Sequence, residues 1–328
     1  MAVLVIVSVS VMTFFIARVV PSDPAAAWVG PHPTKEQIQR VTRELGLDKP
    51  LTTQYVRYAE DLLRGDLGTS VTTRRPILED VKVFLPATLE LVMVAMALAI
   101  LLGIPLGVLS GARKGSVLDH ATRLISIAGI SVPTFFLGLL LQLFLFGKLG
   151  LLPLGGRLST YVALNHPIVS VTGFLLIDSA IAGNWVAFRD AAVHLIMPGV
   201  VLATYPVGLV IRMTRSTMIE VLSEKYILAA ETLGVPRRIR LFVLALKNAV
   251  IPTLSALALS FVFSLTGSIL IEVIFSWPGL GAYVTNAVLA VDFPVIVSVT
   301  LIVTLFYVVI NLVLDLVQAA LDPRVVLE

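Results

Sequence analysis

The chain has 328 residues, of which 57% are hydrophobic and 14% are charged, and its formal net charge is +3. Soluble domains carry about 25% charged residues, and the mean hydropathy of this chain is +0.96, so the composition excludes an ordinary soluble protein. There is no cysteine, which excludes disulfides and thiolate metal sites. Apolar stretches recur along the whole length, and this favours one membrane domain over two soluble ones.

Six apolar segments are long enough to cross a bilayer, because a hydrocarbon core of about 30 Å needs roughly 20 helical residues. Their approximate bounds are Ala2 to Val20, Pro86 to Ala112, Leu124 to Phe146, Leu195 to Met213, Ala249 to Phe275 and Pro294 to Gln318. A weaker apolar stretch, Val169 to Ala182, is too short to span and is predicted to be a re-entrant or interfacial helix. The predicted fold class is all-α, a polytopic bundle of about six transmembrane helices.

The loops differ in basic residues, and lysine and arginine are retained on the cytoplasmic side of a membrane. The loop from Ser276 to Phe293 has none, whereas the loops after the second and fourth spans are basic, with Arg113, Lys114, Arg123, Arg215, Lys225, Arg237, Arg238, Arg240 and Lys247. The second and fourth loops are therefore predicted inside, together with both termini. We expect a multi-pass membrane protein. Its basic residues lie in short loops rather than on one soluble face, which does not favour nucleic-acid binding.

Four parts follow from this topology: a first transmembrane helix (1–20), an extracytoplasmic loop (21–85), a membrane domain (86–318) with a cytoplasmic loop (214–248), and a tail (319–328). The outer loop has helical signals. Thr34 and Gln37 form a capping-box pattern, the apolar residues Ile38, Val41 and Leu45 share one face, and Gly46 suits a C-terminal cap. A second helix is predicted from Thr52 to Arg64, closed by Gly65. This pair of helices is either a lid or a surface loop with no substrate role.

Within the spans, glycine, proline and one serine mark positions where helices bend or pack closely, at Gly103, Pro105, Gly107, Ser131, Pro133, Pro198, Pro206 and Gly208. Acidic residues lie near the ends of spans, at Glu90, Glu272 and Asp315. A proton or sodium relay needs ionisable groups near the bilayer midplane, so this distribution argues against one.

Enzymatic motifs are missing from the sequence. It has no G-x-x-x-x-G-K-[ST] phosphate cradle, no H-E-x-x-H and no G-x-S-x-G. The chain itself is therefore predicted not to be an enzyme and to bind no cofactor or metal, and if ATP drives it, a partner must bind that ATP.

The fourth loop, from Ser223 to Pro252, reads as helix, break and helix. Ser223 is predicted to cap the first helix, Gly234 to end it in a left-handed conformation, and Pro236 to lie in the first turn of the second. Ala229 and Ala230 are small, so another protein can approach the first helix closely. An exposed helix of this kind suits a groove on a partner.

These residues resemble the coupling motif of the type I permeases of ATP-binding cassette importers, in the dipeptide, oligopeptide and nickel branch. The matching positions are Ala229, Ala230, Gly234, Asn248 and Pro252, while Leu228 replaces the usual glutamate and Lys247 the usual arginine. Further matches run along the chain, at Pro21 to Pro24, Leu45 to Pro50, Gly65 to Ser70, Pro86 to Glu90, Glu272 to Phe275, Pro278 to Gly281 and Leu321 to Arg324.

The resemblance implies a permease subunit of an ATP-driven importer of di- and oligopeptides, located in a prokaryotic inner membrane. Its implied partners are a second, homologous permease, two ATPase subunits that bind ATP and Mg, an extracytoplasmic substrate-binding protein, and membrane lipid. The ATPase-coupling site implied by the resemblance comprises Lys225, Tyr226, Ala229, Ala230, Glu231, Gly234, Pro236, Asn248 and Pro252. The alternatives are an ATP-independent channel or secondary carrier, or an importer of the same class for nickel, sugars or other small solutes.

Overall fold

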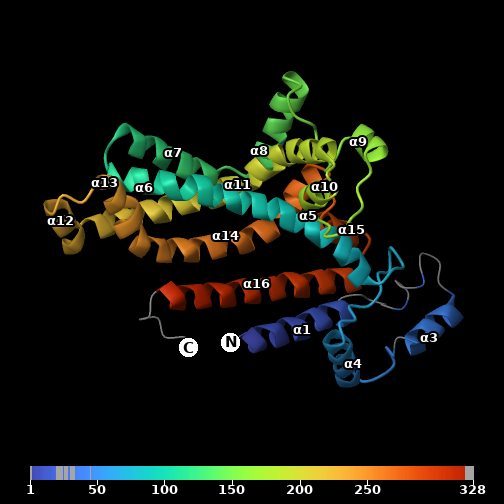
Figure 1. Cartoon of the computed structure of the whole chain (residues 1–328). Helices are drawn as coiled ribbons and strands as arrows, with labels where there is room; N and C mark the ends of the chain where they lie inside the picture. Colours follow the sequence, from blue (N-terminus) through green and yellow to red (C-terminus); the bar gives the residue numbers. More distant parts are fainter. Residues whose placement is uncertain (1, 20–24, 26–28, 30–33, 45, 322–328) are drawn as a thin grey trace. The chain divides into compact units, whose positions relative to one another are not determined.

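The computed structural model describes residues 2–19, 25, 29, 34–44 and 46–321, and its named elements are all helices (Figure 1). It divides into two compact units, one of residues 1–85 with 282–308 and one of residues 86–281 with 309–328. The predictions made at Pro21 to Pro24, at Leu45 and at 322–324 lie outside the described residues. Two helices, α5 (Ile77–Leu98) and α16 (Phe293–Leu321), contribute residues to both units.

The first unit contains α1 (Ala2–Val19), α3 (Lys35–Glu44), α4 (Leu51–Leu63) and most of α15 (Leu280–Leu289). Helices α1 and α4 pack together through the buried ring of Phe14, which contacts the ring of Tyr55 at a centroid distance of 5.4 Å. The predicted capping box is confirmed, because the Thr34 amide donates to Gln37 Oε1 and the Gln37 amide to Thr34 Oγ1. Gly46 and Gly65 have positive φ, as predicted for residues that end these helices.

A loop of the first unit, residues 66–76, is held by buried polar groups. The Asp292 carboxylate accepts hydrogen bonds from Ser70 Oγ at 2.6 Å and from the Thr72 amide at 2.8 Å. The hydroxyl of Ser298 donates to the Leu67 carbonyl at 2.9 Å. The loop is therefore fixed to residues that lie more than 200 positions later in the sequence.

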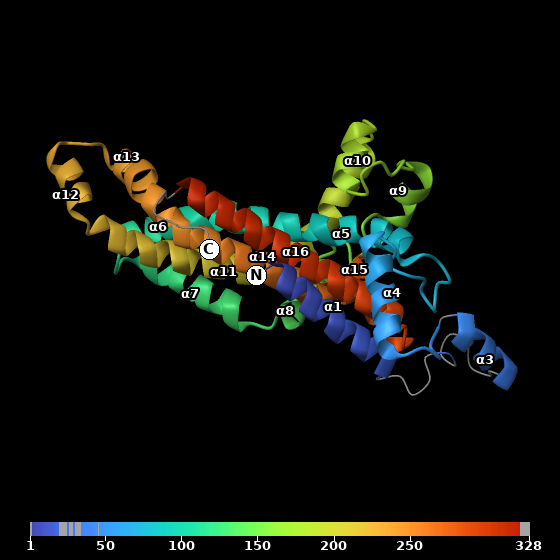
Figure 2. The same cartoon turned by 90° about the horizontal axis from the view of Figure 1, so that it is seen from below.

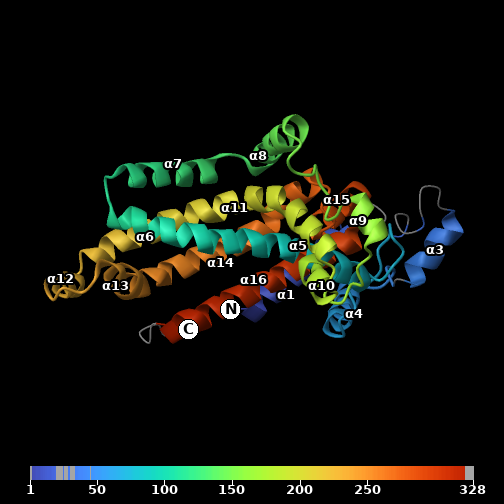
Figure 3. The same cartoon turned by 45° about the horizontal axis from the view of Figure 1, so that its top comes forward.

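The second unit is built around α11 (Trp185–Leu222), which packs against α14 (Leu246–Ile274), α6 (Ile104–Ala112) and α7 (Val117–Ser131) (Figure 3). Helix α6 comes very close to α11 along a stripe of glycines. A Cβ atom on these glycines would lie 2.6 to 2.8 Å from a side chain of α11, in the pairs Gly103 with Val210, Gly107 with Thr214 and Gly111 with Met218. The predicted close packing at Gly103 and Gly107 is thus confirmed.

Four helices among the described residues are long and apolar enough to cross a membrane: Ile77–Ala112, Trp185–Leu222, Arg237–Ile274 and Phe293–Ala320. The helices that contain the second and fourth predicted spans begin nine and ten residues before them, at Ile77 and Trp185. The N-terminal helix contributes a shorter apolar stretch, Leu4–Ile16.

The third predicted span, Leu124 to Phe146, is not one straight helix. Helix α7 ends at Ser131, and α8 (Thr134–Leu141) with η2 (Gln142–Lys148) continues at 103° to it. The cause is Pro133, which disfavours helical backbone at the residue before it, and Val132 is in fact extended with ψ of 126°. The predicted stretch Val169 to Ala182 contains only a seven-residue helix, α10 (Leu175–Ile181), preceded by α9 (Thr160–Asn165).

Candidate functional site

The loop between the fourth and fifth spans forms a protruding helix, α12 (Lys225–Thr232), at the end of the second unit that lies farthest from α9 and α10 (Figure 2). It ends as predicted, because Gly234 has φ of +76°. The Gly234 amide donates to the Glu231 carbonyl and the Val235 amide to the Ala230 carbonyl, both at 3.0 Å. These two hydrogen bonds form a Schellman motif, which gives partners to carbonyls that have none within the helix.

The start of α12 differs from the prediction. Glu224 is the N-cap residue and makes no side-chain capping bond. The hydroxyl of Ser223 donates instead to the Glu220 carbonyl at 2.6 Å, so it belongs to the end of α11. A serine hydroxyl can donate to a carbonyl three residues earlier as well as accept from a later amide, and sequence alone did not separate these roles.

After α12 the chain turns directly into the fifth span. Pro236 is the residue before α13 (Arg237–Ile239) rather than in its first turn, and α13 continues through η3 (Arg240–Ala245) into α14. Arg237–Ile274 is therefore one long helix, which runs from the predicted loop into the predicted fifth span without a break at residue 248.

The inner side of α12 is anchored by apolar packing. Ile227 and Ala230 are buried, and Ile227 lies in a cluster with Met218 of α11 and Leu241 and Ala245 of η3. The prediction that both alanines face a partner is corrected here, since Ala230 is 8% exposed. Burial of this face fixes the orientation of the helix on the bundle.

Polar contacts join α12 to the following helix. Glu231 and Arg240 form an ion pair with a distance of 2.6 Å between Oε1 and Nη1. Asn248 Nδ2 donates to Tyr226 Oη at 2.6 Å. The structure thus brings together residues predicted as one site although they are up to 22 positions apart. Pro252 lies one turn further along α14, inside the helix, and touches neither contact.

The outer side of α12 is open. Lys225, Leu228, Ala229 and Leu233 are exposed, and Leu233 has 82% of its surface accessible. The helix therefore presents a mixed apolar and basic surface whose orientation is fixed by Ile227 and Ala230 beneath it. Within the part of the chain that the structure describes, no three His, Asp or Glu side chains gather in a group able to hold a metal ion.

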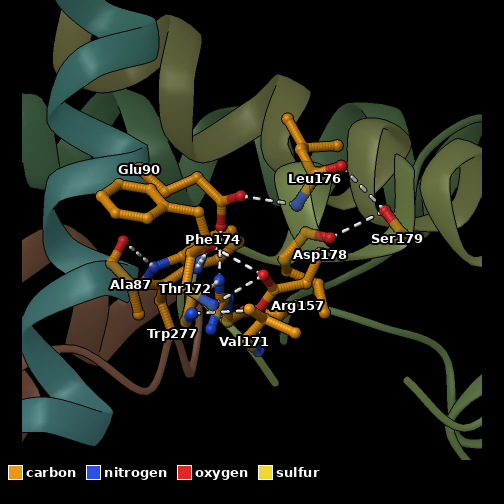
Figure 4. A network of polar contacts seen from close by, with 12 residues as sticks. Ala87, Glu90, Arg157, Val171, Thr172, Phe174, Leu176, Asp178, Ser179 and Trp277 are labelled. Atoms are coloured by element: carbon orange, nitrogen blue, oxygen red, sulfur yellow. Dashed lines mark hydrogen bonds and ion pairs between the residues drawn. The ribbon is translucent and has the colours of Figure 1, made fainter. Parts of the chain in front are cut away.

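Two of the acidic residues predicted near span ends form an ion pair or hydrogen bonds at the end of the second unit opposite α12. Glu90 pairs with Arg157 at 2.5 Å, and Arg157 also lies over the ring of Trp277 (Figure 4). Glu272 is fully buried and accepts hydrogen bonds from Thr88 and Ser268. Sequence reasoning placed these acids correctly but missed their partners, which come from distant segments.

Comparison with known proteins identifies the family. Residues 103–327 match the model described as binding-protein-dependent transport system inner membrane component, and residues 1–92 match the N-terminal model of the same system. The chain is 43% identical to the probable D,D-dipeptide transport system permease protein DdpB of Escherichia coli K12, over 98% of this chain and 94% of that protein. It is 39% identical to the di/tripeptide transport system permease protein DppB of Pseudomonas aeruginosa, over 97% and 94%.

A solved structure shows the same fold. It is a chain of the MetNI methionine ABC transporter in an inward-facing conformation, with a TM-score of 0.53, 16% identity, and coverage of 72% of this chain and 93% of that one. The bundle around α11 is thus a type I importer permease fold, as the sequence predicted. The chain belongs to the family of binding-protein-dependent transport system inner membrane components.

Proposed function

We propose that this chain is one permease subunit of an ATP-driven peptide importer, and that the open side of α12 docks into a groove of an ATPase subunit on the cytoplasmic side. The observation that carries the proposal is the geometry of α12: its inner face is buried, its outer face is open, and the chain turns from it directly into the long apolar helix Arg237–Ile274. A helix held in this way can transmit movement of a partner to the bundle.

The cargo follows from the relatives, which are named as permeases for D,D-dipeptides, dipeptides and di- or tripeptides. We infer that di- or oligopeptides are carried by this chain together with a second permease, after delivery by a substrate-binding protein. ATP and the loaded binding protein would each stabilise one conformation over another, and ATP and Mg would be bound by two ATPase partners.

Both termini and the basic loops at 113–123 and 214–248 are placed in the cytoplasm in this proposal, because lysine and arginine gather there. The Glu231 to Arg240 ion pair then lies at the base of the docking helix on the cytoplasmic side.

The proposal is tested by placing a large side chain on the open face of α12. Ala229→Arg and Gly234→Trp should leave the amount of inserted protein nearly unchanged but abolish ATP-dependent uptake of a labelled dipeptide and recovery of the ATPase with the permease. Leu63→Arg is the control, because Leu63 is 89% exposed on α4 and far from α12 in sequence. Normal uptake and normal ATPase recovery by both α12 variants would refute the proposal.

A further inference from the structure

Residues 149–186, which run from the end of η2 to the first two residues of α11, fold around two buried ionic groups. Arg157 and Glu90 form an ion pair in which 16% and 5% of the side chains are exposed, and Arg157 also donates to the Gly173 carbonyl at 3.1 Å. The second carboxylate oxygen of Glu90 accepts a hydrogen bond from the amide of Leu176, at the start of α10, with a distance of 2.8 Å (Figure 4). The ion pair thus fixes both halves of this segment to α5.

The second ionic group is Asp178 of α10, which is 2% exposed. Its carboxylate accepts hydrogen bonds from the amides of Val171, Thr172 and Gly173 and from Thr172 Oγ1, at 2.7 to 3.2 Å. Buried backbone amides need such partners, and the need is strictest where no water is available to replace them. The Asp178 carboxylate therefore supplies hydrogen-bond acceptors to the non-helical backbone amides of this segment.

The outside of the segment carries no charged side chain and is rich in exposed apolar ones. The only Asp, Glu, Lys or Arg residues from 149 to 186 are Arg157 and Asp178, and both are turned inward. By contrast, large apolar side chains are 64 to 78% exposed, at Tyr161, Leu164, Val169, Val171, Ile181 and Trp185. Soluble proteins rarely expose large apolar areas to water.

We propose that residues 149–186 lie in the interfacial layer of the lipid bilayer, in the leaflet at the end of the second unit opposite α12. Lipid fits this surface better than a protein partner does, because protein interfaces carry a polar rim with hydrogen bonds and charges. Tyrosine and tryptophan are the residues that gather at the level of the lipid headgroups, and the exposed Tyr161 and Trp185 belong to this segment. The chain also runs from this segment directly into the helix Trp185–Leu222, which contains the predicted fourth span.

The absence of cysteine allows a direct test. Single cysteines are introduced by Leu164→Cys, Val169→Cys and Ile181→Cys, and each is spin-labelled in the assembled transporter in lipid nanodiscs. The accessibility of the label to molecular oxygen, which concentrates in lipid, is compared with its accessibility to a water-soluble nickel chelate. Leu312→Cys on the span α16 is the lipid reference, and Glu36→Cys on the charged helix α3 is the water reference.

We expect the ratio of oxygen to nickel accessibility at all three positions to approach that at Leu312→Cys and to exceed that at Glu36→Cys several-fold. A ratio equal to that at Glu36→Cys would show an aqueous loop, and protection from both reagents would show a protein partner. Either result would overturn the proposal. Neither depends on whether α12 docks to an ATPase, so the two proposals fail independently.

Discussion

Arg215 of α11 binds Asp119 of α7 with two parallel hydrogen bonds, 2.5 Å from Nε to Oδ1 and 2.9 Å from Nη2 to Oδ2. Asp119 is 1% exposed and also accepts from Ser110 Oγ and from the Gly115 amide. This bidentate pair locks the hairpin of α6 and α7 to the central helix of the second unit. The relationship connects residues 96 positions apart.

Removal of either Asp119 or Arg215 should destabilise the fold, because it leaves the charge of the other side chain buried without a partner. We expect Asp119→Ala and Arg215→Ala each to lower the free energy of unfolding by about 3–5 kcal/mol. Thermal unfolding of the protein in nanodiscs measures this loss. The double variant should be less destabilised than the sum of the two single variants, and simple additivity would show that the two side chains do not interact.

Gly279 should tolerate no side chain. A Cβ atom there would lie 2.5 Å from both Glu272 Oε2 and Thr88 Oγ1, and these two groups are themselves hydrogen bonded. We expect Gly279→Ala to destabilise the protein by about 1–3 kcal/mol. Gly267→Ala is the matched control, since its Cβ would meet nothing within 4 Å. Equal midpoints of thermal unfolding for the two variants would contradict the packing described here.

The left-handed turn after α12 gives a separate prediction. Gly234 has φ of +76° and open space around its Cβ position. Gly234→Ala should therefore cost about 1–2 kcal/mol through backbone strain alone, and Gly234→Asn should cost less because asparagine tolerates this conformation. Chemical denaturation of the two variants provides the comparison, and a larger loss for asparagine would argue against strain as the cause.

Low pH should destabilise the segment from 149 to 186, because protonation of Asp178 weakens its hydrogen bonds. Burial raises the pKa of this carboxyl, but the hydrogen bonds from Thr172, Gly173 and Val171 outweigh burial and hold the pKa below its usual value. The ionised carboxylate therefore stabilises the fold above the unfolded-state pKa of about 3.9, and this stabilisation is lost as the pH falls from that value through the folded-state pKa.

Asp178→Asn provides the measurement of this effect. The difference in thermal midpoint between the native protein and this variant should be largest near neutral pH and should narrow below about pH 4, where the unfolded-state carboxyl is protonated. A difference that stays constant between pH 7 and pH 3 would show that the charge of Asp178 does not hold the segment.

The sequence was a reliable guide where the physical signal is local. The length of the apolar stretches indicated where the long helices lie. The capping box of Thr34 and Gln37 was confirmed, and Gly46, Gly65 and Gly234 adopt the predicted left-handed conformation. The same local signals indicated the protruding helix α12, because glycine and proline set its end.

Features that depend on distant contacts were not predictable in this way. The burial of Ala230 follows from packing against α11 and η3, and the ion pairs of Arg157 and Arg215 join segments 67 and 96 residues apart. The sequence predicted a second helix from Pro236 and a span from Ala249, but not that the two form the single helix Arg237–Ile274.

The central claim is that the open face of α12 touches an ATPase subunit, and a photocrosslink tests it most directly. A photoreactive amino acid placed at Leu233, which is 82% exposed, should crosslink to the ATPase in membranes that contain the assembled transporter. The same amino acid at Leu63 should not. A crosslink from Leu233 only to lipid, or to the external binding protein, would contradict the account.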